Sequence, residues 1–357
     1  MKNMIDYMKK YGHLSFEEKP FCEVDSMILV QLSYFDFANT LAEQTNFEHT
    51  LQECLEKDYD KSRVAGIWNP KKNDMMARLI MTLPRFSHIK IGYYVNKIEV
   101  DNEKQFSAIA FLLQEGLYYI AYRGTDAHFI GWKEDLNLAY LENIPSQREA
   151  VTYLTDFASI YPGQYIVGGH SKGGNLATFA SACVDESIQE CILTVYNHDG
   201  PGFLPEFYEK PSYQNIESKI IKTIPKDALV GLLLEPSNRY QVVASNAFLF
   251  VQHDQFNWVI EDDHPKYIQD VTKISKHTRK AITNWVNQMD MATRESFINT
   301  IYAMIEETKI ERLSGFVKKL PRNLFIMNKA YKKLSVEERK MVRDALVSFL
   351  ACYVGKK

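Results

Sequence analysis

The chain has 357 residues, of which 46% are hydrophobic and 24% are charged. These fractions are typical of globular proteins and exclude a disordered or fibrous chain. No apolar run reaches the roughly 18 residues of a membrane-spanning helix, and residues 1–10 lack the apolar core of a secretory signal. Five cysteines without a closely spaced pair predict reduced thiols, a cytoplasmic location and no zinc site.

The net charge of −3 conceals an uneven distribution. Residues 264–357 contain 19 Lys and Arg against 9 Asp and Glu, whereas residues 1–263 contain 23 against 36. A basic segment of this kind binds an anionic surface, or it docks on the acidic part of its own chain. Because acids are interleaved with the cations and no nucleic-acid motif accompanies them, we expect no nucleic-acid partner.

The elements of the first two thirds predict an α/β fold. Residues 1–85 are predicted to be helical, with Asp25 as the N-cap of a buried helix over 25–41. A β-hairpin is expected over 106–122, around the turn 114–116 (QEG). Further on, a strand at 165–169 precedes a helix at 172–184, and more strands are expected at 191–196, 219–223 and 240–244. Strands that alternate with helices favour a mostly parallel central sheet flanked by helices.

The strand pattern ends near residue 264, where the charge balance also changes. Helices are predicted over 267–289, 292–307 and 335–353, and the last begins with Ser335 and Glu338 at the spacing of a capping box. We therefore expect an α/β domain over residues 1–263 and a helical C-terminal region over residues 264–357.

The strongest chemical signal is a Gly-x-Ser-x-Gly motif at residues 169–173 (GHSKG), centred on Ser171. The motif lies between a predicted strand and a predicted helix, which is the context of a nucleophile elbow in an α/β-hydrolase. Glycines two residues before and after the serine allow the tight turn that exposes its hydroxyl. The free N–H groups at the start of the next helix point at the site where an oxyanion would form.

The elbow and a second segment resemble those of the class 3 lipase family. Residues 169–177 (GHSKGGNLA) resemble its elbow, with Lys172 where leucine is common, and residues 119–125 (YIAYRGT) with Asp135 resemble its oxyanion segment. The resemblance implies backbone N–H donors at Thr125, helped by its hydroxyl, and at Lys172. It covers roughly residues 106–255. The wider chain resembles a bacterial lipase-like family of unknown function.

A serine nucleophile needs a histidine base and an acid, which follow in the order Ser, acid, His in this fold. Among His198, His253, His264 and His277, we favour His253, which follows an expected last core strand at 248–252 and matches the family position. For the acid we favour Asp227, which follows the strand 219–223 and resembles the family's catalytic segment. Asp199 and Glu235 are alternatives, and Asp199 is interpreted as lining the site.

The sequence thus predicts a hydrolase of carboxylic esters, in particular apolar or lipid acyl esters, that acts through Ser171, His253 and Asp227. No cofactor is expected, and the partner is an ester substrate with peripheral membrane contact as a further possibility. The alternative is a lipase-like scaffold that binds a membrane surface or a protein without catalysis.

Overall fold

The computed structural model describes residues 1–41, 45–57, 67–99, 101–126, 129–138, 140–236, 239–310 and 319–354. Within these residues, nine strands form one sheet, in the spatial order β1 (His49–Thr50), β2 (Lys90–Glu99), β3 (Lys104–Gln114), β4 (Leu117–Tyr122), β5 (Gln164–His170), β6 (Ile192–His198), β7 (Ile220–Pro225), β8 (Gln241–Val243) and β11 (Tyr267–Ile268). Strands β4 to β8 run parallel, and the strands at both edges pair antiparallel. The predicted α/β-hydrolase architecture is confirmed.

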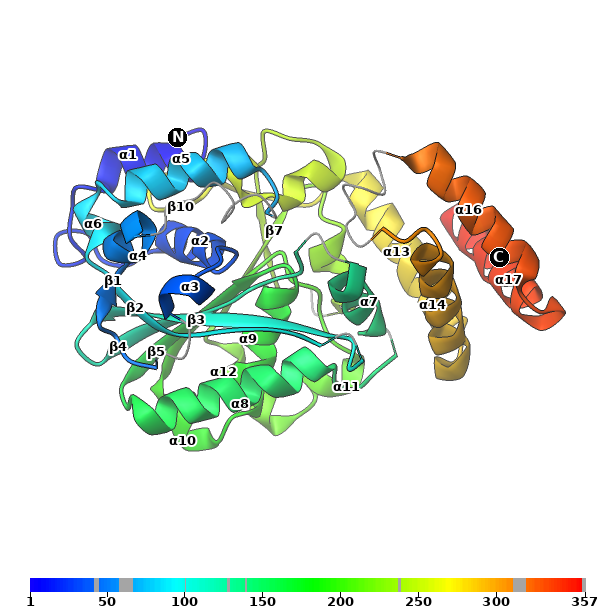
Figure 1. Ribbon diagram of the computed structural model, residues 1–357, viewed down its shortest axis with the longest axis horizontal. Helices are drawn as coiled ribbons and strands as arrows, with labels where there is room; N and C mark the ends of the chain where they lie inside the picture. The colour runs from blue at the N-terminus through cyan, green and yellow to red at the C-terminus, as the bar shows by residue number, and fades with distance from the viewer. Residues whose placement is uncertain are drawn as a thin grey trace.

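Helices cover both faces of the sheet (Figure 1). One face carries the N-terminal helices α1 (Met4–Tyr11), α2 (Glu23–Leu32), α3 (Ala38–Leu41), α4 (Leu51–Lys57), α5 (Pro70–Ile80) and α6 (Pro84–Ser87). The other carries α8 (Pro145–Ile160), α9 (Lys172–Cys183), α10 (Glu186–Cys191) and α12 (Pro211–Glu217). Alternation along β3 supplies both cores, because Ile109 and Phe111 face the N-terminal helices while Ala108 and Ala110 face α8 and α9.

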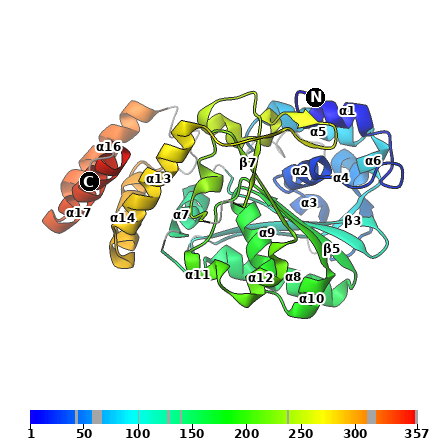
Figure 2. The ribbon, with the colours of Figure 1, turned by 180° about the vertical axis from the view of Figure 1, so that it is seen from behind.

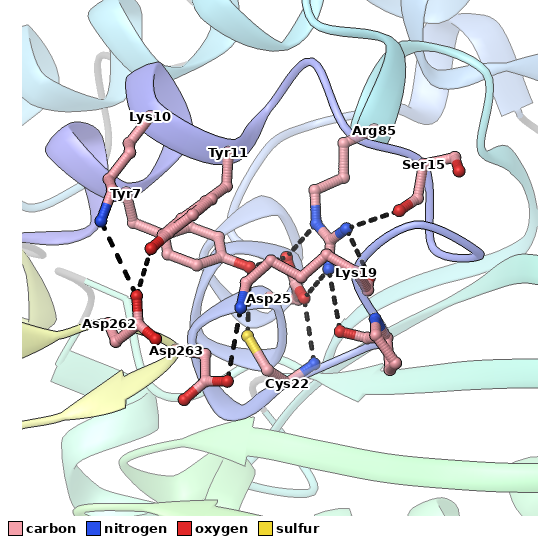
Figure 3. A network of polar contacts seen from close by, with 11 residues as sticks. Tyr7, Lys10, Tyr11, Ser15, Lys19, Cys22, Asp25, Arg85, Asp262 and Asp263 are labelled. Atoms are coloured by element: carbon pink, nitrogen blue, oxygen red, sulfur yellow. Dashed lines mark hydrogen bonds and ion pairs between the residues drawn. The ribbon is translucent and has the colours of Figure 1, made fainter.

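The N-terminal helices are fastened by a buried ion pair between Asp25 and Arg85, whose side chains are both fully enclosed (Figure 3). The Arg85 Nε donates to Asp25 Oδ1 at 2.8 Å, and its Nη1 donates to the Lys19 carbonyl at 2.8 Å. Asp25 lies inside α2 and accepts the Cys22 N–H at 3.0 Å, so the N-cap is Cys22 and not Asp25 as predicted. The network holds the loop before α2 against α6.

Strands continue beyond the predicted limit at residue 263. The short strand β10 (His264–Pro265) pairs with β9 (Ile260–Glu261), and β11 joins the main sheet beside β8. The helical C-terminal region therefore begins at α13 (Lys273–Asn287), six residues later than the helix predicted from residue 267. The division into two domains remains a prediction.

The remaining C-terminal helices are α14 (Met291–Glu306), α16 (Leu320–Lys333) and α17 (Val336–Val354). Ser335 and Glu338 form the predicted capping box, since the Ser335 N–H donates to Glu338 Oε2 at 2.8 Å and the Glu338 N–H to Ser335 Oγ at 3.1 Å. These helices project from one end of the sheet, with α13 and α14 nearer to it (Figure 2). Among the described helices, none is long and apolar enough to cross a membrane.

Candidate active site

Ser171 occupies the sharp turn between β5 and α9. Its backbone adopts φ +58° and ψ −133°, a positive-φ conformation that is costly for any residue except glycine. A Cβ at position 169 would lie 2.0 Å from the Gly173 carbonyl oxygen, and one at position 173 would lie 2.1 Å from that of Tyr122. The turn therefore requires glycine at both positions. This geometry is that of a nucleophile elbow.

His253 belongs to the 3-10 helix η3 (Leu249–His253), where a final core strand was predicted. Its Nδ1 lies 2.6 Å from Asp199 Oδ2, and the Asp199 side chain is only 1% exposed. Burial raises the pKa of Asp199, and the neighbouring His253 opposes that rise. The Gly231 N–H donates to the other carboxyl oxygen at 3.0 Å, so Asp199 is fixed from two sides. His253 and Asp199 thus have the arrangement of the base and the acid in a catalytic triad.

The carboxylate that contacts His253 Nδ1 is that of Asp199, and not that of Asp227, the predicted acid. The Asp227 carboxyl group accepts from the Gln252 side-chain amide and from the Leu249 N–H. Asp199 follows β6, which lies directly beside β5, whereas Asp227 follows β7, one strand further from the elbow. Because the carboxyl ends of adjacent parallel strands meet at one edge, an acid after β6 lies nearer to Ser171.

The segment after β4 packs directly against the elbow. A Cβ on Gly124 would lie 3.1 Å from the Ser171 Cβ, so the backbone of Gly124 and Thr125 borders the nucleophile. The Thr125 hydroxyl donates to Asp135 Oδ2 at 2.6 Å. Contrary to the prediction, it is therefore not available as a donor to an oxyanion. The backbone N–H groups of Thr125 and of Lys172, the first residue of α9, remain as candidate donors.

Asp135 lies beside this oxyanion segment, and one of its carboxyl oxygens makes no hydrogen bond with the described residues. Its Oδ1 is enclosed and has no hydrogen-bond partner among the described residues. Burial raises the pKa of Asp135 to about 6, while the nearby Lys172 ammonium opposes the rise. A carboxyl group in this position orients the Thr125 side chain and hence the loop that carries the candidate donor.

The Lys172 side chain points into the protein and not toward solvent or substrate. Its Nζ lies 2.7 Å from Glu134 Oε2 and 2.9 Å from the Gln105 carbonyl oxygen, and both charged side chains are fully buried. Glu134 also accepts from the Ser146 N–H and hydroxyl, each at 2.8 Å. The pair joins the start of α9 to α7 (Phe129–Asn137) and β3.

His170 is a site residue that the sequence reasoning missed. Its Nε2 lies 2.7 Å from the His253 carbonyl oxygen, and its Nδ1 lies 3.0 Å from the Tyr34 hydroxyl. Since Nε2 faces a carbonyl, it carries the proton and Nδ1 accepts from Tyr34. Burial, reinforced by His253, lowers the pKa of His170 well below its usual value. The signal in the sequence is the histidine directly before the nucleophile.

The other three histidines considered as the base have structural contacts. His198 is fully buried between Ser26 Oγ and Thr223 Oγ1, each 2.9 Å from a ring nitrogen, and burial lowers its pKa to about 3. His264 stacks on Tyr267, and His277 contacts the Tyr353 carbonyl oxygen. None of these contacts orients an imidazole toward an acid at the elbow. In the part of the chain that the structure describes, no cluster of three or more His, Cys, Asp or Glu could hold a metal.

Ser171, His253, Thr125 and Lys172 all line one cavity of about 1530 Å³. Its walls are largely apolar, and helices α13 and α14 contribute side chains to them. The apolar lining residues include Leu204, Leu229, Leu232, Trp285, Phe297 and Ile298. The candidate catalytic groups thus open onto a space that is large enough for an extended apolar substrate.

A sheet with parallel central strands, helices on both faces and an elbow between β5 and α9 defines the chain as an α/β-hydrolase. The chain belongs to the Mbeg1-like family, whose model matches residues 80–303. This match confirms the expectation that the chain belongs to a lipase-like family. A search of curated proteins finds no match.

Three solved structures share parts of the fold at low identity. The crystal structure of M37 lipase is 16% identical, over 59% of this chain and 70% of that chain, with a TM-score of 0.37. The Rhizomucor miehei lipase–propeptide complex is 18% identical, over 45% and 58%, with a TM-score of 0.33. A mutant form of MDLA from Penicillium cyclopium is 12% identical, over 68% and 83%, with a TM-score of 0.38.

Proposed function

We propose that this protein is a serine hydrolase that cleaves carboxylic esters through Ser171, His253 and Asp199. The observation that carries the proposal is the 2.6 Å contact between His253 Nδ1 and Asp199 Oδ2, with His253 and the strained Ser171 on the same cavity. A buried carboxylate on Nδ1 orients the imidazole and stabilises its protonated form, which is the role of the acid beside a catalytic base. Asp199 takes the place of Asp227 in the predicted triad, and the other two residues are unchanged.

The mechanism begins when the His253 Nε2 accepts the proton of the Ser171 hydroxyl as Oγ attacks the ester carbonyl. Asp199 stabilises the resulting imidazolium, and the backbone N–H groups of Thr125 and Lys172 stabilise the oxyanion, each by on the order of 3 kcal/mol. The imidazolium then protonates the departing alcohol, which leaves an acyl ester on Ser171. Water, deprotonated by His253, cleaves that ester and releases the carboxylic acid.

The size and lining of the cavity support an ester substrate with an apolar acyl chain. Its volume of about 1530 Å³ exceeds the roughly 300–1,000 Å³ of a typical small-molecule site. Leucine, phenylalanine and tryptophan side chains from the loop after β7 and from α13 and α14 line it. Each methylene that leaves water for such a wall contributes about 0.8 kcal/mol, so kcat/KM should rise with acyl length.

A fluorophosphonate probe tests the nucleophile, because it reacts covalently with activated serines. We expect labelling of the wild-type protein and none of Ser171→Ala, while Ser159→Ala, on the surface of α8, labels normally. Nitrophenyl esters of increasing chain length then test the acyl preference. Labelling that survives Ser171→Ala, or a wild-type protein that neither labels nor turns over any ester, would contradict the proposal and favour a non-catalytic scaffold.

A further inference from the structure

Helices α16 and α17 form the outermost part of the molecule, beyond α13 and α14 (Figures 1 and 2). The inner side of α17 is fixed on α13. The Trp285 Nε1 donates to the Ala345 carbonyl at 2.8 Å, and the Trp285 and Phe349 rings lie 5.3 Å apart. The side of α17 that faces away from α13 leaves its residues exposed, and its composition is unusual for a surface.

The outer side of α17 carries an apolar stripe. Leu346, Leu350 and Val354 repeat every four residues, and Val347 lies beside them, so all four share one side of a helix with 3.6 residues per turn. Their side chains are 49%, 59%, 66% and 58% exposed, in that order. Residues of this kind rarely gather in the open on a soluble protein, and where they do they mark an interaction surface.

Helix α16 adds further exposed apolar side chains, among them Leu324 at 53% and Phe325 at 59%. The Lys329 ammonium lies 5.1 Å from the centre of the Phe325 ring. The two helices together therefore present aliphatic and aromatic groups, with a cation placed directly beside the aromatic ring.

The positive charge of this region lies on α16, whereas α17 is balanced, with three acidic and three basic residues. Helix α16 contains Arg322, Lys329, Lys332 and Lys333 and no Asp or Glu in its sequence. On α17, Arg343 lies four residues before Val347 and seven before Leu350, so it continues the apolar stripe toward the start of the helix, where it also pairs with Asp344 at 3.1 Å. We call the exposed surface of these two outermost helices, with the apolar groups of both and the cations of α16, the α16–α17 face.

We propose that the α16–α17 face docks on the surface of an anionic lipid bilayer. The apolar side chains would enter the boundary between headgroups and acyl chains, and the Lys and Arg side chains would contact lipid phosphates. None of the described helices is long and apolar enough to cross a membrane. The proposed contact places α16 and α17 along the bilayer surface. Such docking is separate from ester hydrolysis and depends on exposed residues outside the cavity.

Vesicle sedimentation of the full-length protein tests this surface. We expect binding to vesicles of phosphatidylcholine mixed with phosphatidylglycerol, little binding to phosphatidylcholine alone, and a decrease as salt is added. Replacing Lys329, Lys332 and Lys333 by Gln should weaken binding about five-fold for each lysine that lies near the lipid. Leu346→Ser with Leu350→Ser should also weaken binding, by a factor on the order of ten or more, because two apolar side chains that would enter the bilayer are lost.

A matched control removes exposed apolar groups elsewhere on the molecule. Ile160→Ser with Leu193→Ser, at side chains that are 52% and 42% exposed on the hydrolase, should leave vesicle binding unchanged. Ser171→Ala should bind as wild type, which separates this inference from the proposed catalysis. Circular dichroism confirms that each variant is folded.

The inference is overturned if the folded wild type does not bind anionic vesicles, or if the α16–α17 variants bind as well as the wild type. It is also overturned if sedimentation velocity shows a dimer that the Leu346 and Leu350 variants dissociate while vesicle binding is absent, because a second copy would then cover this face. Binding that is equal for neutral and anionic vesicles contradicts the role of the cations.

Discussion

Asp199→Asn isolates the contribution of the buried acid. An asparagine keeps the shape of the side chain but cannot stabilise the imidazolium that forms on His253 during attack. For two charges in contact at 2.6 Å with an effective dielectric constant of ~20, the attraction is on the order of 6 kcal/mol. At about 1.4 kcal/mol per factor of ten, this predicts a loss of kcat of about 10⁴, which agrees with the loss of about 10⁴ known for the same change in serine proteases.

The assay is steady-state hydrolysis of a nitrophenyl ester, with Asp227→Asn as the matched control. We expect kcat to fall and KM to change little for Asp199→Asn, because the interaction develops only in the transition state. Asp227→Asn should retain turnover within a few-fold, since its carboxyl group contacts Gln252 and Leu249. If Asp199→Asn keeps full turnover while remaining folded, or if the two variants lose activity equally, the assignment of the acid is wrong.

Three further outcomes follow from the buried polar groups. Lys172→Leu should lower the free energy of unfolding by about 3–5 kcal/mol in urea titrations, because the Glu134 carboxylate is left buried without its cation, and Glu134→Gln in the same chain should recover part of it. His170→Phe should lower kcat more than it raises KM, since the His253 carbonyl loses its 2.7 Å contact; an unchanged kcat would remove this positioning role. The pKa of His198 is lowered from 6.5 to about 3, so only the unfolded chain takes up this proton as pH falls below 6.5. This difference lowers the free energy of unfolding by about 2 kcal/mol at pH 5. In urea unfolding, His198→Gln should therefore reduce the change of that free energy between pH 6.5 and 5.

The nucleophile was predictable because its signal is local. Gly169 is required by contacts with Gly173 and Gly174 in the same turn, whereas Gly173 is required by the backbone of Tyr122 at the end of β4. The residues of the motif nevertheless lie within five consecutive positions, so the pattern can be recognised without the strand order. The capping box of Ser335 and Glu338 was predictable for the same reason.

The acid was not predictable in this way, because its identity depends on which strands are adjacent. Asp199 and Asp227 each follow a strand, and a sequence gives no measure of their distances from Ser171. The sheet order places β6 beside β5, and the turn of η3 brings His253 toward Asp199. A final core strand was expected in place of η3, and Asp227 was favoured because it follows the strand 219–223 and resembles the family's catalytic segment.

The burial of the Lys172 side chain could not be predicted from the local motif, because its partners are distant in the sequence. A lysine beside a nucleophile is expected to be solvated or to face the substrate, yet Glu134 and Gln105 enclose its ammonium group from a helix and a strand that are 38 and 67 residues away in sequence. The same pair explains why a cation is tolerated at a position where leucine is common in the class 3 lipase family. The ion pair and its hydrogen bonds satisfy the charge that burial would otherwise disfavour.

The charge boundary near residue 263 suggested two separate parts, but the cavity joins them. Ser275 Oγ donates to the Ala228 carbonyl at 2.5 Å, and Arg279 donates to the Glu235 carbonyl, so α13 is tied to the loop after β7. Trp285 and Ile298, on α13 and α14, line the same cavity as Ser171. Helices α13 and α14 line the cavity and also pack against α16 and α17, so the proposed site and the α16–α17 face are joined through these two helices.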